Sequence, residues 1–233
     1  MERTRIRDRF EAGHLLAEQL RHYAGRDDVI VLALPRGGVP VGYEVAKALR
    51  APLDVFVVRK IGVPEYEELA MGAIASGGLV LLNPEPMRAL GIGDADVRRA
   101  AALAARELER REEAYRGGHD PPDVEGKTVI LVDDGLATGS TMRAAALAVR
   151  QLNPARVVVA VPVAAAETCD EFRDVVDEIV CGVTPRPFHA VGLWYDDFSQ
   201  TRDDEVRDLL ARANDFAETQ PASRDGGSSA RSG

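Results

Sequence analysis

Short apolar runs rich in β-branched residues recur along the chain, and segments with helical spacing separate them. Runs that are apolar at every position are typical of parallel strands buried on both faces. Their alternation with helices predicts an α/β fold with a central, mainly parallel sheet flanked by helices. Strands are expected at 29–34, 53–58, 128–132, 156–161 and 178–181.

Helices are expected between these strands, and one hairpin interrupts the alternation. Ser76-Gly77-Gly78 joins two short apolar runs at 73–75 and 79–82, which predicts the hairpin. The run RELERREEAY is interpreted as a solvated helix face with i,i+4 ion pairs. Helices are expected at 6–20, 39–49, 94–115, 141–152 and 167–175, the third ending at Gly117-Gly118.

The length of 233 residues suits one domain, which we expect at 1–215. From Phe216 onward the chain fills with serine, glycine and polar residues, so 216–233 is predicted to be a disordered tail. Cys169 and Cys181 show neither a disulfide framework nor zinc spacing, and both are interpreted as small core residues.

Charge and hydropathy exclude several classes of partner. A net charge of −9 and a pI near 5.1 argue against nucleic acid, because no excess positive charge is available to displace counterions from phosphates. No apolar run approaches the roughly 20 residues of a membrane span, so no membrane partner is expected. The charged start MERTRIRDRFEAGH is unlike a signal peptide, which favours a cytoplasmic location.

The stretch VILVDDGLATGST, residues 129–141, places two acids and a small-residue loop directly after a buried strand. Ligands of such sheets bind at the carboxyl ends of the strands. The next helix directs free N–H groups at the loop, the hydroxyls of Thr138, Ser140 and Thr141 add donors, and Gly139 allows close approach. The loop thus predicts a phosphate site. Asp133 and Asp134 would accept hydrogen bonds from sugar hydroxyls or hold a metal.

Two other interpretations of this stretch are weaker. Asp133 and Asp134 could merely cap a helix, but a cap requires one acidic or hydroxyl residue rather than two carboxylates and three hydroxyls. A Walker A loop would require a lysine that is absent here.

The stretch VILVDDGLATGST resembles the phosphoribosyl pyrophosphate motif of type I phosphoribosyltransferases. The similarity to this family extends over most of residues 5–212. The chain is most similar to stand-alone members whose acceptor is not established. The resemblance implies the type I phosphoribosyltransferase fold, in which a small hood or lid accompanies the central sheet. It also implies that Asp133 and Asp134 bind the ribose hydroxyls, and that Ala137, Thr138, Gly139, Ser140 and Thr141 bind the 5-phosphate.

The loop LPRGGVPVG, residues 34–42, also follows a strand and opens a helix, so it is a second candidate anion site. In the family the matching loop binds pyrophosphate, often through a cis peptide that does not involve a proline nitrogen. The resemblance places that bond between Pro35 and Arg36, with Arg36, Gly37 and Gly38 facing the diphosphate.

Two cations and a glycine-bearing segment are expected at the same edge. Arg59 and Lys60 are predicted to end the second strand there, as catalytic cations, although solvated charges are the alternative. In the family a mobile loop follows and closes over the donor, and GVPEYEEL, residues 62–69, is the candidate.

The segment FHAVGLWYDDF, residues 188–198, resembles the part of purine phosphoribosyltransferases that stacks on the base and reaches a magnesium-bound water. Carried over, Phe188 or His189 would stack, with Trp194 in the same segment, and Asp196 would join Asp133 and Asp134 at the metal. A core role for these aromatics is the alternative.

One position departs from the hypoxanthine-guanine enzymes, which have an aspartate where this chain has Ala137. Because that carboxylate serves as acid or base at a purine nitrogen, its absence leaves the acceptor undetermined.

The sequence therefore predicts a pentosyltransferase of nucleotide salvage. It would move the 5-phosphoribosyl group from phosphoribosyl pyrophosphate, with magnesium bound to this donor, to a small nitrogenous acceptor, and release pyrophosphate. Family likeness implies that this acceptor is a nucleobase. One rival is a regulator that senses the donor without transfer, and another is a phosphatase or hydrolase that uses strand-end aspartates. Homodimers are common in the family, which is the reason to expect one here.

Overall fold

A five-stranded sheet in the order β2-β1-β6-β7-β8 forms the centre of the computed structural model, which describes residues 5–63 and 66–218. Each neighbouring pair of its strands is parallel. The prediction of an α/β fold with a parallel sheet is therefore confirmed. The strands are β1 (Val29–Ala33), β2 (Leu53–Val55), β6 (Thr128–Val132), β7 (Arg156–Val163) and β8 (Glu178–Val183).

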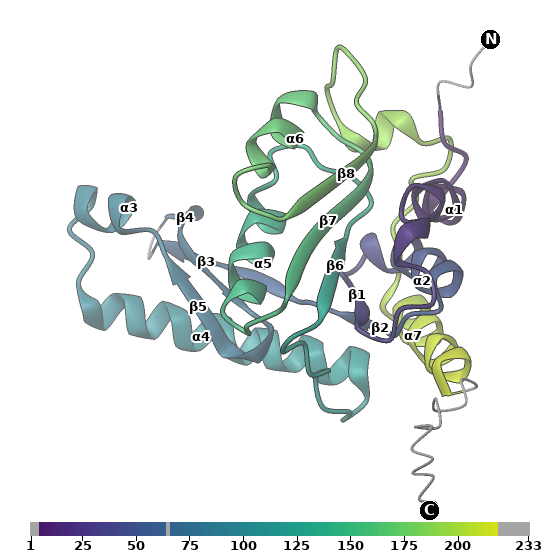
Figure 1. The fold of residues 1–233 in the computed structure, drawn as a ribbon. Coiled ribbons are helices and arrows are strands. Elements are labelled where there is room, and N and C mark those ends of the chain that lie inside the picture. The colour runs from purple at the N-terminus through teal and green to yellow at the C-terminus, as the bar shows by residue number, and fades with distance from the viewer. Residues whose placement is uncertain (1–4, 64–65, 219–233) are drawn as a thin grey trace, which may run out of the picture.

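Helices cover both faces of this sheet (Figure 1). Successive residues of a strand point to opposite faces. Val31 and Ile130 accordingly belong to one core, whereas Leu32 and Leu131 belong to the other. Helices α1 (Arg9–Gln19), α2 (Gly38–Leu49) and α7 (Asp203–Glu218) contribute to the first core, together with the long helix 94–116 that follows the second sheet. Helices α5 (Ser140–Arg150) and α6 (Ala166–Phe172) contribute to the second core.

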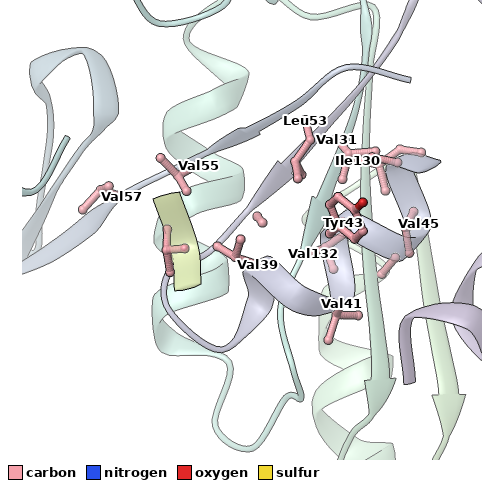
Figure 2. Packing of buried hydrophobic residues seen from close by; sticks show 14 of the residues in the cluster. Val31, Val39, Val41, Tyr43, Val45, Leu53, Val55, Val57, Ile130 and Val132 are labelled. Carbon is pink, nitrogen blue, oxygen red and sulfur yellow. The ribbon is translucent and has the colours of Figure 1, made fainter. Parts of the chain in front are cut away.

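Helix α2 is apolar nearly all round, which is typical of a helix enclosed by other elements. Figure 2 shows Val39 and Tyr43 of α2 in one cluster with Val31 and Val132 of the sheet. On the outer side of α2, a Cβ atom added at Gly13 of α1 would lie 2.7 Å from the carbonyl oxygen of Val41. This close packing fixes the start of α2 at the end of the sheet where β1 finishes.

A second, antiparallel sheet of three strands projects from the central one, and α4 packs along it (Figure 1). The predicted hairpin is confirmed, because a short 3-10 turn (Ser76–Gly78) joins its last two strands. This sheet corresponds to the expected hood. Its elements are β3 (Val58–Val63), β4 (Tyr66–Ala75) and β5 (Leu79–Leu82), followed by α3 (Pro84–Ala89) and α4 (Asp94–Arg116).

One prediction about residues 53–69 was wrong, and another lies partly outside the described residues. The strand expected at 53–58 is divided, because β2 ends at Val55 and β3 begins at Val58 in the other sheet. The candidate mobile segment 62–69 includes the end of β3 and the start of β4, whereas residues 64–65 lie outside the described residues. Its movement over the donor stays a prediction. Apolar β-branched residues continue through the break, so periodicity alone cannot reveal it.

The other expected elements agree with the structure to within a few residues. Helix α4 ends at Gly117, which has a left-handed conformation, as predicted. The i,i+4 pairs Glu107–Arg111 and Glu112–Arg116 are present, but the Arg116 side chain is only 7% exposed because it also binds Asp54. Short 3-10 helices at Arg21–Tyr23 and Val191–Trp194 were not predicted.

The domain boundary at residue 215 stays a prediction. Helix α7, which was not predicted, runs through this position, so residues 216–218 are helical rather than part of a tail. The remainder of the expected tail, residues 219–233, lies outside the described residues.

Cys169 and Cys181 form a disulfide bond, so the prediction that they are not paired was wrong. Their interpretation as core residues agrees with the structure, because Cys169 is buried in the second core and Cys181 packs partly buried against it. Helix α6 returns the chain to the sheet as β8, which brings the two Cα atoms to 6.8 Å. Cysteine spacing of twelve residues does not by itself indicate such a reversal.

None of the helices in residues 5–63 and 66–218 has the length and apolar character that a bilayer span requires.

Candidate functional site

The two acidic residues lie directly after β6, at the carboxyl edge of the sheet, as expected. Arg9 of α1 donates to Asp134 Oδ2 from Nε at 2.9 Å, and its Nη2 lies 2.8 Å from the same oxygen. The Asp134 backbone N–H donates to Asp133 Oδ1 at 2.8 Å. The side chains of Arg9 and Asp134 are only 11% and 16% exposed. The acidic pair is therefore part of a crowded ion-pair network rather than a solvated edge.

Burial raises the pKa of both carboxyl groups. For Asp133, the negative charge of Asp134 adds to the effect of burial and holds the pKa well above its ordinary value. For Asp134, burial also raises the pKa, whereas the charge of Arg9 and its hydrogen bond oppose that rise. Carboxylates kept in such surroundings are typical of binding and catalytic sites.

The sequence assigned both carboxylates to a ligand, and it did not predict the ion pair between Asp134 and Arg9. Arg9 binds the Asp134 carboxylate, and the buried hydroxyl of Tyr195 donates to the Asp134 carbonyl oxygen at 2.6 Å. Arg9 also lies 4.1 Å from the ring centre of Phe198 and donates to the Ser199 carbonyl oxygen at 2.7 Å. Arg9 is one of several arginines in a charged start, so its role had no sequence signal.

The candidate diphosphate loop packs against the acidic pair. A Cβ atom added at Gly37 would lie 2.0 Å from Asp134 Oδ2, and one added at Gly38 would lie 2.7 Å from the Val132 carbonyl oxygen and 3.0 Å from Asp133 Cα. Only glycine allows this approach. The Pro35–Arg36 peptide bond is cis, which agrees with the expectation from the family. The two loops predicted from separate parts of the sequence therefore meet.

Arg36 lies on the side of this loop that faces α4 and α7. Its Nη1 is 3.9 Å from Asp203 Oδ1, the first residue of α7, and its side chain is 36% exposed. Arg36 is thus available to an anion approaching from solvent.

The small-residue loop leads into the first turn of α5, which begins at Ser140. Gly139 precedes it with φ at +69°, a backbone conformation that favours glycine. Thr168 of α6 supports the loop from behind, because its hydroxyl donates to the Ala137 carbonyl oxygen at 2.6 Å. Among the hydroxyl-bearing residues, Thr138 and Thr141 are exposed and Ser140 lies between them at the N-terminus of α5. The loop is therefore open to a ligand there.

Arg59 and Lys60 lie in β3 of the hood rather than at the end of a central strand, so their predicted placement was wrong. The two side chains point to opposite faces of β3, as neighbouring strand residues do. Lys60 lines a cavity of about 450 Å³ together with Thr138, Ser140 and Thr141. Arg59 lies on the α4 side, 3.7 Å from Glu107 Oε1. The structure thus brings Lys60, and not Arg59, to the small-residue loop.

The residue of segment 188–198 that contacts the acidic pair was not among those predicted, and the stacking role of Phe188 or His189 stays a prediction. Phe188 and Trp194 pack partly buried against the core of α1, α2 and α7, and His189 is exposed. Tyr195, which the sequence did not single out, is the residue that reaches the acidic pair. The Trp194 Nε1 atom is buried without a hydrogen-bond partner in the described part of the chain.

Asp196, the predicted third metal-binding carboxylate, lies 3.5 Å from Arg5 Nε and is about half exposed. Within residues 5–63 and 66–218, no three acidic, histidine or cysteine side chains are grouped closely enough to hold a metal ion. Asp133 and Asp134 are thus a pair of carboxylates rather than part of a larger group of potential metal ligands among the described residues.

Comparisons with known proteins identify the family and the fold of the chain. A family model described as phosphoribosyl transferase domain matches residues 4–189. Two Mycobacterium tuberculosis proteins, from strains CDC 1551 and H37Rv, are each named "Putative phosphoribosyl transferase". Each is 46% identical to this chain over 212 residues, or 91% of it. The chain spans about half the length of these relatives, 48%.

A solved structure gives the same result for the fold. The crystal structure of TT1426 from Thermus thermophilus is 43% identical and superimposes with a TM-score of 0.77, covering 89% of this chain and 98% of that one. Because the family model matches far more than half of the residues, the resemblance stated from the sequence is confirmed, and the chain belongs to the phosphoribosyl transferase domain family.

Proposed function

We propose that this protein transfers the 5-phosphoribosyl group of phosphoribosyl pyrophosphate to a nitrogen atom of a small acceptor and releases pyrophosphate. The observation that carries the proposal is the contact between the Gly37-Gly38 loop and the acidic pair Asp133-Asp134. Two candidate anion loops and two carboxylates thereby share one edge of the sheet. A sugar with a phosphate at one end and a diphosphate at the other requires such an arrangement.

Each part of the donor has a matching group. The 5-phosphate binds the N–H groups and hydroxyls of residues 137–141 at the start of α5. The ribose hydroxyls donate to Asp133 and Asp134, whose carboxylates have further lone pairs beyond those used by Arg9 and the backbone. The diphosphate binds Arg36 and the Gly37-Gly38 loop. Lys60 approaches from the hood.

If magnesium arrives with the donor, the carboxylates of Asp133 and Asp134 are the residues that would hold it. This fits the raised pKa values of the pair, because a divalent cation offsets the charge repulsion that burial intensifies. When bound, the ion supplies positive charge to the departing diphosphate.

In the reaction, the bond from C1 to the diphosphate oxygen breaks and the diphosphate keeps its electron pair. The acceptor nitrogen donates a pair to C1, and its proton passes to solvent water. Negative charge therefore grows on the diphosphate, and the partly exposed guanidinium of Arg36 is the group to which we assign its stabilisation. Such preorganised donors give large rate effects, often ~10²-fold or more for one group. Because Ala137 carries no carboxylate, the loop does not supply an acid or base to the acceptor, whose identity we leave at the level of a nitrogenous base.

The test is an assay of pyrophosphate release by the full chain with donor and magnesium against a panel of nucleobases and other nitrogen nucleophiles. Turnover on at least one acceptor supports the proposal. Donor binding without turnover on any acceptor would favour the sensing regulator, and absence of donor binding would contradict both. Phosphate release from simple esters would favour a hydrolase.

A further inference from the structure

A small cavity of about 130 Å³ lies beside Arg36, away from the acidic pair. Three of its lining side chains are guanidinium groups, and one is a carboxylate. This excess of positive charge occurs in a chain with a net charge of −9. The lining residues are Arg36 from the diphosphate loop, Arg110, Arg111, Ala114 and Tyr115 from α4, and Asp203 from α7.

The nearby carboxylate of Glu107 offsets only part of this charge. It accepts from Arg110 Nε at 3.0 Å and Nη2 at 2.9 Å, and from Arg111 Nε at 3.3 Å. It also lies 3.7 Å from Arg59 Nη1. Hydrogen bonds from Arg110 lower the pKa of Glu107 to about 2, so it stays anionic, but one negative charge is shared among three guanidinium groups. Each guanidinium has five N–H donors, so donors remain for an anion.

The carboxylate of Asp203 lies in the cavity and is held there by one hydrogen bond and a distant guanidinium group. Its Oδ1 accepts from the Tyr115 hydroxyl at 2.9 Å, whereas Arg36 Nη1 is 3.9 Å away, beyond hydrogen-bond length. Its side chain is 56% exposed, so a stronger anion can displace it without opening the core. The cavity is smaller than the ~300 Å³ of ordinary organic-ligand pockets, so it suits a phosphate group rather than a nucleoside.

Arg36 connects this cavity to the candidate donor site, because the next residue, Gly37, packs on Asp134. We infer that Arg36, Arg110 and Arg111 form a subsite for the terminal phosphate group of a diphosphate, so that two side chains of α4 complete the diphosphate site. Arginine suits this role because its planar fork binds two phosphate oxygens at once. The inference rests on the proposed function for the assignment of the neighbouring loop.

The experiment is calorimetric titration of the full chain with inorganic diphosphate, inorganic phosphate and ribose 5-phosphate. The double variant R110Q/R111Q is expected to bind diphosphate at least tenfold more weakly than the wild type, and to bind ribose 5-phosphate equally. Arg106→Gln, on the same helix outside the cavity, is the matched control and should leave diphosphate affinity unchanged.

Asp203→Asn provides a test with the opposite sign. The amide oxygen can still accept from Tyr115, while the competing negative charge is removed, so diphosphate should bind several-fold more tightly. If R110Q/R111Q fails to fold by circular dichroism, Arg110→Gln alone, whose side chain is 69% exposed, replaces it. Equal diphosphate affinity in the arginine variant, in Asp203→Asn and in the wild type would overturn the subsite.

The outcomes also separate this inference from the proposed function. Diphosphate binding that depends on Arg110 and Arg111, in a chain that binds no phosphoribosyl pyrophosphate, would support the subsite as a site for free diphosphate and contradict the proposed reaction. Turnover of the donor that is identical in the wild type and in R110Q/R111Q, in both KM and kcat, would retain the reaction and reject the subsite.

Discussion

Asp133 places a carboxyl group where the folded protein disfavours its charge. Burial and the neighbouring charge of Asp134 raise its pKa in the folded state above the ordinary value. The stability that this group contributes is therefore full below its unfolded pKa of about 3.9, and is lost as the pH rises through the raised folded value. At neutral pH the acidic pair destabilises the fold, which is understandable if its charge serves a ligand.

We expect Asp133→Asn to raise the melting temperature at neutral pH and to abolish donor binding. The amide oxygen can still accept from the Asp134 N–H, while the buried charge is removed. Thermal unfolding of both proteins from acidic to neutral pH measures this effect. The difference in melting temperature should shrink toward low pH, where the wild-type carboxyl group is protonated. A variant less stable than the wild type at neutral pH would contradict the assigned direction.

Removing the charge of Arg9 is expected to destabilise the fold, whereas removing the charge of Asp133 is expected to stabilise it. Arg9→Met leaves Asp134 as an unpartnered, mostly buried carboxylate, and breaking a buried ion pair costs about 3 kcal/mol or more. Arg7→Met is the control, because the Arg7 side chain is 61% exposed and its pair with Asp8 contributes little. Urea unfolding should separate the two variants clearly. Equal free energies of unfolding would show that the Arg9–Asp134 pair does not support the site.

The close contact between the end of β6 and the start of α2 depends on the absence of a side chain at residue 38. Gly38→Ala would place a Cβ atom 2.7 Å from the Val132 carbonyl oxygen, which belongs to a central strand and cannot move freely. We expect a loss of stability of about 1–3 kcal/mol, as for other overpacked sites, and weakened donor binding.

The control for this variant is Gly93→Ala at the start of α4. A Cβ atom there meets only Asp96 Oδ2, at 3.8 Å, so its effect should be smaller. Chemical unfolding and donor titration of both variants measure the difference. A Gly38→Ala protein as stable as Gly93→Ala would show that the two loops are not packed as tightly as described.

Most elements of the central sheet could be predicted because β1, β6 and β7 are long, nearly continuous apolar runs rich in valine. β6 was predicted with its observed bounds, and its loop led directly to the acidic pair. The division between β2 and β3 could not be predicted, because it depends on pairing with β4, which follows later in the chain. Helix α7 was missed because its buried side chains are interspersed with acidic residues.

For the candidate site, too, the residues within a local sequence motif could be predicted and the others could not. Asp133, the 137–141 loop and the Gly37-Gly38 loop each have a local motif and were found. Arg9 and Tyr195 have none, since they act through contacts with Asp134 across more than sixty residues of sequence. Residues that support a site from distant elements are visible only once the fold brings them together.

Helix α7 closes the molecule over α2. Its buried residues Val206, Leu209 and Leu210 each contribute roughly 1.5–3 kcal/mol of burial. That sum is comparable to the ~5–15 kcal/mol by which whole domains are stable. We therefore expect a chain that ends at Arg202 to lose its cooperative unfolding transition, as measured by circular dichroism.

A chain that ends at Glu218 is the matched control for this truncation. The predicted disorder of the tail implies that its melting temperature equals that of the full chain. A large decrease would show that the last fifteen residues contribute to the fold, and would contradict the predicted domain boundary.

Cys169 follows Thr168, whose hydroxyl supports the Ala137 carbonyl, and Cys169 is bonded to Cys181 at the far border of the sheet. The disulfide bond thus links α6, which supports the 137–141 loop through Thr168, to the edge strand β8, although neither cysteine lies in the candidate site. A reductant in the purification buffer would open this disulfide bond and remove one support of the 137–141 loop, whereas purification in air would keep it. Donor affinities measured on the two preparations are therefore comparable only after the free thiols have been counted.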